Sequence, residues 1–320
     1  MPVAKSPRKG SLQYWPRKRA RKFLPRVNWN IINSGKEGLR GFICYKVGMK
    51  SALVKDTTEN SMTKGKRIAV PVTILECPPM KILSVRFYKN GTVKNEIIND
   101  EVIKDKDLKR KLKLPKSSKT IIDKIKLENY DIDDIHIVVY SQVKNTNIKK
   151  TPDISELKIY GESLESKFKI VKDLLRKEIN ISDIFEKGQL IDVRGLTTGR
   201  GLSGPVKRFG ITLKSHKSEK GRRKPGSLGP WHPARTTFRA PQAGQLGMFS
   251  RVICNNKILD ISKPSERAIT NIKNYGDVKT DYLIVRGSIQ GASKRQLIIT
   301  PPYRPTRKQI KKKLELLELK

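Results

Sequence analysis

The sequence predicts a mixed fold, in which a β-barrel carries an inserted α/β subdomain and two long basic extensions. Three observations lead to this expectation. Short segments rich in β-branched and aromatic residues occur early in the chain and again late. The region between them has nearly balanced charge and one helical pattern. Two other stretches are strongly basic and have almost no hydrophobic periodicity.

The expected strands form an early and a late group, and each strand is bounded by Gly, Pro, Asn or Asp. Because the two groups flank the balanced region, we expect them to close one barrel. The early strands are 42–45, 51–54, 68–75 and 82–88, and the late ones are 189–193, 249–261 with a turn near Asn255 and Asn256, 281–289 and 295–300. A further strand, 135–140, lies in the balanced region.

Residues 94–194 hold 22 basic and 19 acidic side chains, which is the balance of an ordinary globular surface. Within them, residues 163–177 place apolar side chains at helical spacing, and Ser163 is a residue type typical of N-caps. We expect the apolar stripe to pack into the core; it consists of Leu164, Phe168, Val171, Leu174 and Leu175. A short helix is also expected over 309–320.

These patterns divide the chain into seven parts. They are an extended basic arm at 1–40, the first part of the barrel at 41–93, the inserted α/β subdomain at 94–180, a returning barrel strand at 181–198, a basic Gly-rich finger at 199–248, the last part of the barrel at 249–303 and a basic C-terminal helix at 304–320.

Charge restricts the class of partner. The chain holds 69 Lys and Arg against 30 Asp and Glu, a formal charge of +39. The imbalance is concentrated in residues 1–50, with 13 basic and 1 acidic side chain, and in 195–250, with 11 and 1. A small neutral ligand cannot neutralise this charge, so we expect an anionic partner.

Several other classes are excluded. The apolar runs fall far short of the roughly 20 residues that span a bilayer, and no signal-peptide segment follows the N-terminus, which favours the cytosol. Cys44, Cys77 and Cys254 are odd in number and lack a C-x-x-C pair. We therefore expect buried reduced thiols and no disulfide or metal site.

No catalytic constellation is found. The three histidines have neither metal-ligand spacing nor a recognisable nucleophile and acid beside them. His136 is expected in a strand, at the core or an edge, whereas His216 and His232 are expected to bond to or stack on nucleotides. Asp133 and Asp134 are expected to be solvated turn charges.

The first 26 residues contain nine basic side chains and no acidic one, and their four prolines exclude a continuous helix. An extended arm follows from this composition. A disordered tail that confers solubility is the alternative. However, Tyr14, Trp15, Phe23 and Trp29 are interleaved with the arginines, and such rings stack on bases or on a surface.

Residues 199–204 read GRGLSG and match the letters of the dinucleotide-binding fingerprint. That motif needs a helix after its last glycine, and residues 205–210 lack helical periodicity, which argues against the cofactor. We instead expect the glycines to let the backbone approach a phosphate chain, whose charge Arg200, Lys207 and Arg208 neutralise. These close-packing glycines are Gly199, Gly201, Gly204 and Gly210.

A basic run at 214–224 leads to Gly-Pro-Trp-His-Pro, a restricted aromatic tip at Trp231. A Trp side chain exposed to water is typical of a binding site. We expect the tip to insert among RNA bases; the alternative is that Trp231 anchors its own loop to the barrel. Arm and finger are thus expected to be two limbs without a core of their own.

Several segments together match one known family: PRKGSL at 7–12, GF at 41–42, KVGM at 46–49, GRG at 199–201, GPVKRFG at 204–210, LGPWHPAR at 228–235, QAGQLG at 242–247 and NYGD at 274–277. In order and over nearly the whole chain, they resemble large-subunit ribosomal protein three. The match is nearest the archaeal and eukaryotic branch, because shorter bacterial members lack the subdomain near 94–180.

The resemblance implies a translation-protein-like β-barrel and a structural role on 23S rRNA, early in subunit assembly. It implies neighbours among the large-subunit ribosomal proteins fourteen and twenty-four, and a finger that reaches towards the peptidyl-transferase centre with Trp231 at its tip. Eukaryotic members carry a modifiable His twelve residues before that Trp, where this chain has Glu219. We therefore expect no such modification, an archaeal member, no enzyme activity, no cofactor and a cytoplasmic location.

The residues expected to contact rRNA are Arg8, Lys9, Arg17, Lys18, Arg19, Arg21, Lys22, Arg200, Lys207, Arg208, Lys214, His216, Lys217, Arg222, Arg223, Lys224, Trp231, His232 and Arg235. Two alternatives remain. One is a chromatin protein that compacts duplex DNA with the same cations; the other is an RNA-modifying enzyme, which would need a cofactor pocket.

Overall fold

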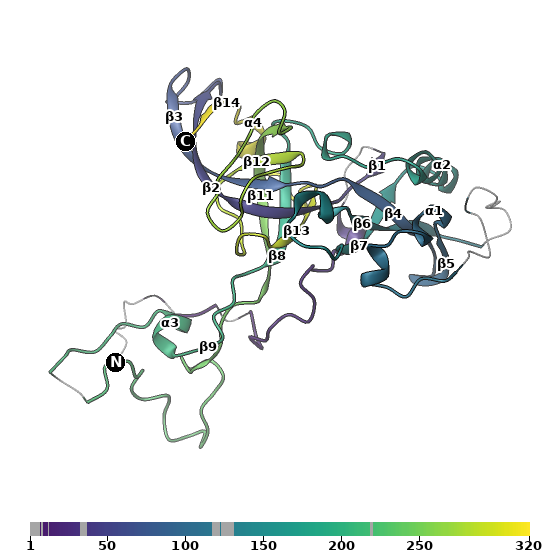
Figure 1. The fold of residues 1–320 in the computed structure, drawn as a ribbon. Helices are drawn as coiled ribbons and strands as arrows, with labels where there is room; N and C mark the ends of the chain where they lie inside the picture. The colour runs from purple at the N-terminus through teal and green to yellow at the C-terminus, as the bar shows by residue number, and fades with distance from the viewer. Residues whose placement is uncertain are drawn as a thin grey trace. The chain divides into compact units, whose positions relative to one another are not determined.

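The computed structural model describes residues 7, 9–11, 13–32, 37–116, 122, 131–217 and 220–320. The chain forms two compact units. We call Leu24–Gly195 with Val252–Lys320 the core unit, and Met1–Phe23 with Leu196–Arg251 the basic unit. Most regular structure is strand, and helices are few and short (Figure 1).

The larger sheet pairs its strands in a closed circuit, β13-β8-β11-β12-β3-β2, because β13 hydrogen-bonds to both β8 and β2. β14 adds to the outer part of β2. The strands are β2 (Phe42–Asp56), β3 (Arg67–Glu76), β8 (Leu190–Leu196), β11 (Ser250–Ser262), β12 (Tyr282–Arg286), β13 (Gln296–Thr300) and β14 (Leu314–Leu319).

The second sheet has the order β1-β7-β6-β4-β5 and is antiparallel throughout. Its strands are β1 (Gly38–Leu39), β4 (Met80–Lys89), β5 (Thr92–Ile98), β6 (Asp134–Ser141) and β7 (Ile154–Tyr160). The predicted helix is present as α2 (Leu164–Leu175), and the Ser163 hydroxyl caps it by accepting from the Ser166 N–H. Its stripe packs into the core as expected.

Short helices complete the described chain. In the core unit they are η1 (Trp29–Ile31), α1 (Asp100–Ile103), η2 (Leu108–Arg110), η5 (Val143–Thr146), η6 (Ile181–Asp183) and α4 (Arg307–Lys311). The basic unit contains α3 (Pro205–Phe209) and a pair of two-residue strands, β9 (Leu202–Ser203) and β10 (Gly244–Gln245).

One apolar cluster joins the two sheets of the core unit. Phe42 and Tyr45 of β2 belong to it, together with Phe87 of β4 and Phe168 of α2. A second cluster lies along the outer halves of β2 and β3. Because removing apolar surface from water is the main favourable term in folding, these clusters determine the shape of the core unit.

The predicted C-terminal helix is wrong over Leu314–Leu319, which forms β14. Leu314 and Leu316 pack on the second apolar cluster while Glu315 and Leu317 are exposed, an alternation that suits a strand. The expected turn near Asn255 is also wrong. Asn255 adopts a positive φ of 58°, but β11 continues through it.

Packing crosses two of the predicted boundaries. The arm was expected to extend to residue 40, but residues from Leu24 onward belong to the core unit, where Trp29 is 6% exposed and Ile32 is buried. Their large apolar side chains gain more from burial than from an extended surface position. The insertion was expected at residue 94, but β4 already pairs with β5 and β6 in the second sheet.

Cys44 and Cys77 are buried, as expected. Cys254 is exposed, which corrects the prediction. It lies in the first half of β11, where alternate side chains face outward.

Candidate nucleic-acid interface

The basic unit is built on a two-stranded stem formed by the ends of the finger. The Thr197 N–H donates to the Phe249 carbonyl at 3.0 Å, and the Arg200 N–H donates to the Leu246 carbonyl at 2.9 Å. β9 and β10 continue this antiparallel pairing. The stem therefore holds the two ends of the long Gly-rich segment side by side.

A short helix follows the stem, contrary to the expectation from periodicity. Gly204 is the N-cap of α3, Pro205 is its first residue, and Gly210 ends it with a φ of 67°. Five residues are too few to display a helical period. The strand before α3 pairs antiparallel with β10, so this is not the parallel βαβ unit of a dinucleotide site.

The ring cluster, which we define as Trp15, Phe209 and Phe238, joins the first 23 residues to the finger. The Trp15 and Phe209 rings stack with centroids 6.3 Å apart, and the Trp15 and Phe238 rings meet edge to face at 5.2 Å. The Arg17 guanidinium lies 4.4 Å from the Phe209 centroid, and that of Arg208 lies 5.3 Å from it. Cation–π attraction therefore adds to the apolar contacts.

The arm and the finger, which were expected to lack a core of their own, thus share a small cluster of rings. The Ala20 N–H donates to the Met248 carbonyl at 2.9 Å, a second link between the two segments. The packing of these rings could not be predicted from the sequence, because Trp15 and Phe209 lie about 200 residues apart and follow no period.

Arg208 also fixes the returning segment of the finger. Its Nε donates to the Gln245 carbonyl at 3.1 Å, and its Nη1 donates to the Gln242 carbonyl at 3.0 Å. Partial burial lowers the pKa of Arg208. This arginine thus has a structural role besides the phosphate contact predicted for it.

Two glycines that the sequence reasoning missed allow close approach within the basic unit. Gly10 has a φ of 84°, and a Cβ there would lie 2.5 Å from a Phe209 ring carbon. Gly247 has a φ of 80°, and its Cβ would lie 2.0 Å from the Thr198 carbonyl oxygen. Both positions therefore require glycine.

The predicted glycines behave differently. A Cβ at Gly199 would touch Met248 at 3.1 Å, whereas Gly201, Gly204 and Gly210 face open space. Gly201 and Gly210 have positive φ, which accounts for glycine there. Gly204 has an ordinary φ of −69°, so neither backbone strain nor packing in this chain requires glycine at that position.

The predicted rRNA contacts are mostly exposed. Arg8 lies outside the described residues. Arg17, Arg208 and Lys214 are half-buried, and the Lys214 carbonyl accepts from Arg222 Nε at 3.1 Å. The remaining basic residues are exposed: Lys9, Lys18, Arg19, Arg21, Lys22, Arg200, Lys207, His216, Lys217, Arg222, Arg223, Lys224 and Arg235.

The aromatic tip of the finger faces solvent. Trp231 is 85% exposed and His232 is exposed. This exposure favours the predicted aromatic tip over a loop anchor. A large apolar ring left in water indicates a binding role.

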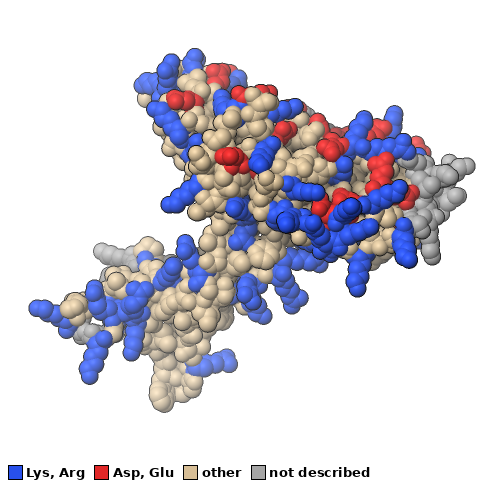
Figure 2. Space-filling model, viewed as in Figure 1, with Lys and Arg blue, Asp and Glu red and all other residues tan. Residues whose placement is uncertain are grey.

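Charge in the basic unit has one sign. Residues 1–23 contain eight Lys and Arg, residues 196–251 contain twelve, and Glu219 is the single acidic residue of both segments. On the face shown in Figure 2, blue side chains project from this unit and no red ones are seen on it, whereas the core unit carries both colours. Self-repulsion of this kind favours an anionic partner.

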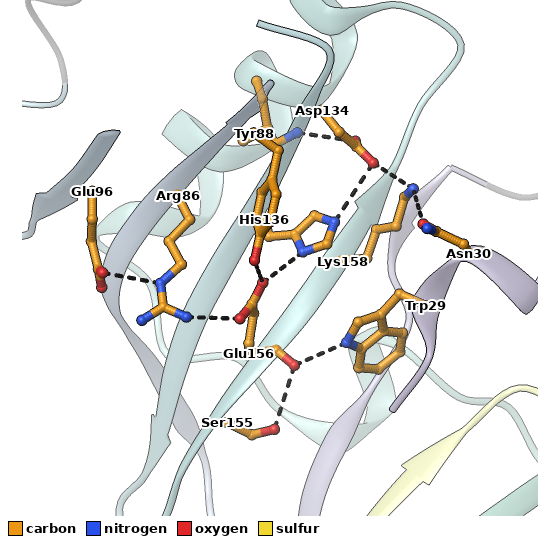
Figure 3. A network of polar contacts seen from close by, with 11 residues as sticks. Trp29, Asn30, Arg86, Tyr88, Glu96, Asp134, His136, Ser155, Glu156 and Lys158 are labelled. Carbon is orange, nitrogen blue, oxygen red and sulfur yellow. Dashed lines mark hydrogen bonds and ion pairs between the residues drawn. The ribbon is translucent and has the colours of Figure 1, made fainter. Parts of the chain in front are cut away.

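A different polar cluster lies on the second sheet of the core unit (Figure 3). Glu156 of β7 accepts from Arg86 Nη1 at 2.7 Å and from the Tyr88 hydroxyl, and it lies 2.8 Å from His136 Nδ1. Burial raises the pKa of Glu156, but hydrogen bonds from His136, Tyr88 and Arg86 outweigh it and lower the pKa to about 2.

The same cluster corrects the prediction for Asp134. Its side chain is 20% exposed and forms ion pairs with Lys158 and Lys167. Asp134 is the first residue of β6 and does not lie in a turn. His136 is buried in β6, as expected. Burial lowers the pKa of His136, but Asp134 and Glu156 together raise it above its usual value. These groups satisfy one another and stabilise the sheet.

In the described part of the chain, no three His, Cys, Asp or Glu side chains gather as metal ligands. None of its helices has the length and apolar character needed to cross a bilayer.

The described chain thus combines a β-rich unit that has its own apolar core with a polybasic unit held by a few rings. The chain matches the model of the family Ribosomal protein L3 over residues 1–320. It belongs to this family, and it is a structural component of the cytoplasmic ribosome rather than an enzyme.

Archaeal relatives agree with this membership. The chain is 40% identical over 315 residues to large ribosomal subunit protein uL3 of Methanobrevibacter smithii, covering 94% of this chain and 93% of the relative. It is 37% identical over 317 residues to the uL3 protein of Methanothermobacter thermautotrophicus, with 95% and 93% covered. The uL3 protein of Methanocaldococcus jannaschii is 35% identical over 318 residues, again with 95% and 93% covered.

Proposed function

We propose that this protein binds and organises 23S rRNA of the large ribosomal subunit through its basic unit. The observation that carries the proposal is the charge of that unit, with eight and twelve cationic side chains in its two segments against one acidic residue. RNA phosphates supply the missing negative charge, and the release of their counterions favours binding.

The proposal assigns different tasks to different side chains. Exposed cations such as Lys18, Arg222 and Arg235 neutralise phosphates and position the chain. Trp231 and His232 contact bases, since single-stranded bases stack on aromatic side chains. Open space at Gly204, where this chain itself does not require glycine, supports a close approach of phosphate to the backbone.

We further propose that the finger reaches towards the peptidyl-transferase centre and that the protein acts early in subunit assembly. The resemblance of the sequence to its family supports both points, as it supports contacts with the large-subunit ribosomal proteins fourteen and twenty-four. In the same way, the closed strand circuit is proposed to be the translation-protein-like barrel, with the second sheet and α2 as the inserted α/β subdomain.

The test compares the affinity of the full chain for fragments of large-subunit rRNA and for duplex DNA of equal length. If 6 to 10 phosphates are neutralised, affinity for rRNA should fall by about 10³ to 10⁵ between about 50 and 200 mM salt. Folded rRNA should be preferred over DNA at every salt concentration.

Three results would contradict the proposal. Affinity independent of salt would exclude phosphate neutralisation. Equal affinity for duplex DNA would favour the chromatin alternative, and a nucleotide cofactor found on the purified chain by mass spectrometry would favour the RNA-modifying enzyme. Co-sedimentation with the large subunit, before and after a high-salt wash, gives an independent readout.

A further inference from the structure

The basic unit contains a hollow of about 530 Å³ between the stem and the first residues of the chain. Gly10, Thr198 and Gly247 are among its lining residues. The volume is within the range of small-molecule sites, roughly 300 to 1,000 Å³, so it can hold one nucleotide.

The lining of this hollow is strongly cationic. Arg17, Arg200, Arg208 and Arg251 are among its residues, and none of the lining residues is Asp or Glu. Four guanidinium groups around one space repel one another. An anion that fits the hollow relieves this repulsion, and phosphate suits the planar fork of arginine well.

Aromatic rings accompany the arginines. Tyr14, which is 56% exposed, and Phe249 both line the hollow. The Arg251 guanidinium lies 4.5 Å from the Tyr14 centroid and 5.3 Å from that of Phe249. Rings and arginine planes are the surfaces on which unpaired bases stack.

A second hollow of about 330 Å³ adjoins the first. Tyr14, Arg17, Phe249 and Arg251 line both spaces. A chain of nucleotides could therefore continue from one space to the next past the same ring and cations, whereas an isolated anion would need one space only.

We propose that these two hollows bind an unpaired segment of RNA, with a phosphate held by Arg200 and Arg17 and a base stacked on Tyr14. The inference rests on the proposed function, since it presumes that the basic unit binds rRNA. It adds a defined site for single-stranded RNA at the base of the finger, distinct from the exposed tip at Trp231.

The test uses the full chain and an in vitro transcript of large-subunit rRNA. Ultraviolet crosslinking followed by mass spectrometry should join Tyr14 or Phe249 to one nucleotide, and that nucleotide should be unpaired in the RNA. Tyr14→Ala should lower affinity about fivefold or more through lost stacking. Tyr14→Phe, which keeps the ring, should bind like the wild type.

The arginines are tested with a matched pair. Arg200→Ala should lower affinity about tenfold or more, because a hydrogen bond to a charged group is lost. Arg222→Ala, an exposed arginine elsewhere in the same unit, should lower it about threefold or less.

The outcomes separate the inference from the proposed function. If the wild type binds rRNA with steep salt dependence but Arg200→Ala and Arg222→Ala behave alike, or the crosslinked nucleotide is base-paired, the site is overturned and rRNA binding stands. A loss of affinity with Arg200→Ala but not with Tyr14→Ala also overturns the site, because it indicates phosphate without a stacked base. If the wild type shows no preference for rRNA, the proposed function itself fails.

Discussion

The core unit and the basic unit keep their shapes by different means. In the core unit, two sheets share one apolar cluster, and acidic partners accompany many of the cations. In the basic unit, the ring cluster, a short stem and arginine contacts to carbonyls and rings hold a surface of one charge. The core unit is stable because it buries apolar surface, whereas repulsion among its cations lowers the stability of the basic unit.

This difference has a consequence for binding. A partner that binds only the folded basic unit stabilises it by mass action, and neutralisation of like charges adds to that effect. The core unit holds 49 Lys and Arg against 29 Asp and Glu over about three times as many residues, so its surplus of like charge is less concentrated and it gains less. The basic unit is therefore expected to become more rigid when it binds rRNA.

Phe87→Ala should cause the largest loss. Phe87 is fully buried between β4 and α2, near the Phe168 ring, so truncation leaves a cavity. Chemical denaturation of the full chain should show a free energy of unfolding lower by about 3–5 kcal/mol. Phe23→Ala, at an exposed ring of the basic unit, is the control and should stay within about 0.5 kcal/mol. Equal losses would contradict the contrast.

Glu156→Gln should have an intermediate effect. It removes the carboxylate shared by Arg86, Tyr88 and His136 and leaves partly buried cations without a counter-charge. Because the Glu156 side chain is 27% exposed, we expect about 2 kcal/mol, less than for a fully buried pair. Glu315→Gln on β14 is the matched control. If both variants have the same free energy of unfolding in denaturant as the wild type, the cluster contributes nothing to stability.

The same cluster predicts how stability depends on pH. The pKa of Glu156 is lowered from 4.5 to about 2, so its contribution is complete above pH 4.5 and is lost as pH falls towards 2. The pKa of His136 is raised above 6.5, so its contribution is complete below pH 6.5 and is lost as pH rises through the raised value. Thermal unfolding at several pH values checks the acidic and the neutral range. In Glu156→Gln, stability should depend less on pH in both ranges.

Trp15→Ala should act locally. It removes the ring on which Phe209, Phe238 and Arg17 pack, but it leaves the apolar clusters of the core unit intact. The main unfolding transition should move by less than about 0.5 kcal/mol, while trypsin should cut after Arg17 to Arg19 several times faster. Bound rRNA should suppress this cleavage. Cleavage at the wild-type rate would show that the ring cluster does not hold the first residues.

Trp231→Ala should have the smallest effect on stability, since the ring is 85% exposed and its removal leaves no cavity. Unfolding should remain within about 0.5 kcal/mol of the wild type. Ribosomes that contain the variant should nevertheless show altered tRNA binding and drug sensitivity, if the finger reaches towards the catalytic centre. Wild-type behaviour in both assays would refute that role.

Local pattern was enough to predict many elements. The stripe of α2 and its cap at Ser163 depend on neighbours in sequence, and the alternation in β3 and the β-branched apolar run in β6 carry their own signal. The stretch that forms β14 was mistaken for a helix, because its leucines fit both periods and only the second apolar cluster selects the strand. The boundary near Leu24 was missed because composition changes gradually there, whereas packing changes at once.

The chemical character of the protein can be read from its residues alone: its surplus of cations, where that surplus lies and which apolar segments can form strands. Composition and short-range spacing are properties of the chain, and no folding is needed to establish them. Three features depend on long-range folding: Trp15 packs against Phe209, Arg208 donates to carbonyls of the returning finger, and four arginines line one hollow. Contacts between residues so far apart in sequence follow no period, because they arise when the stem and the first residues of the chain are brought together.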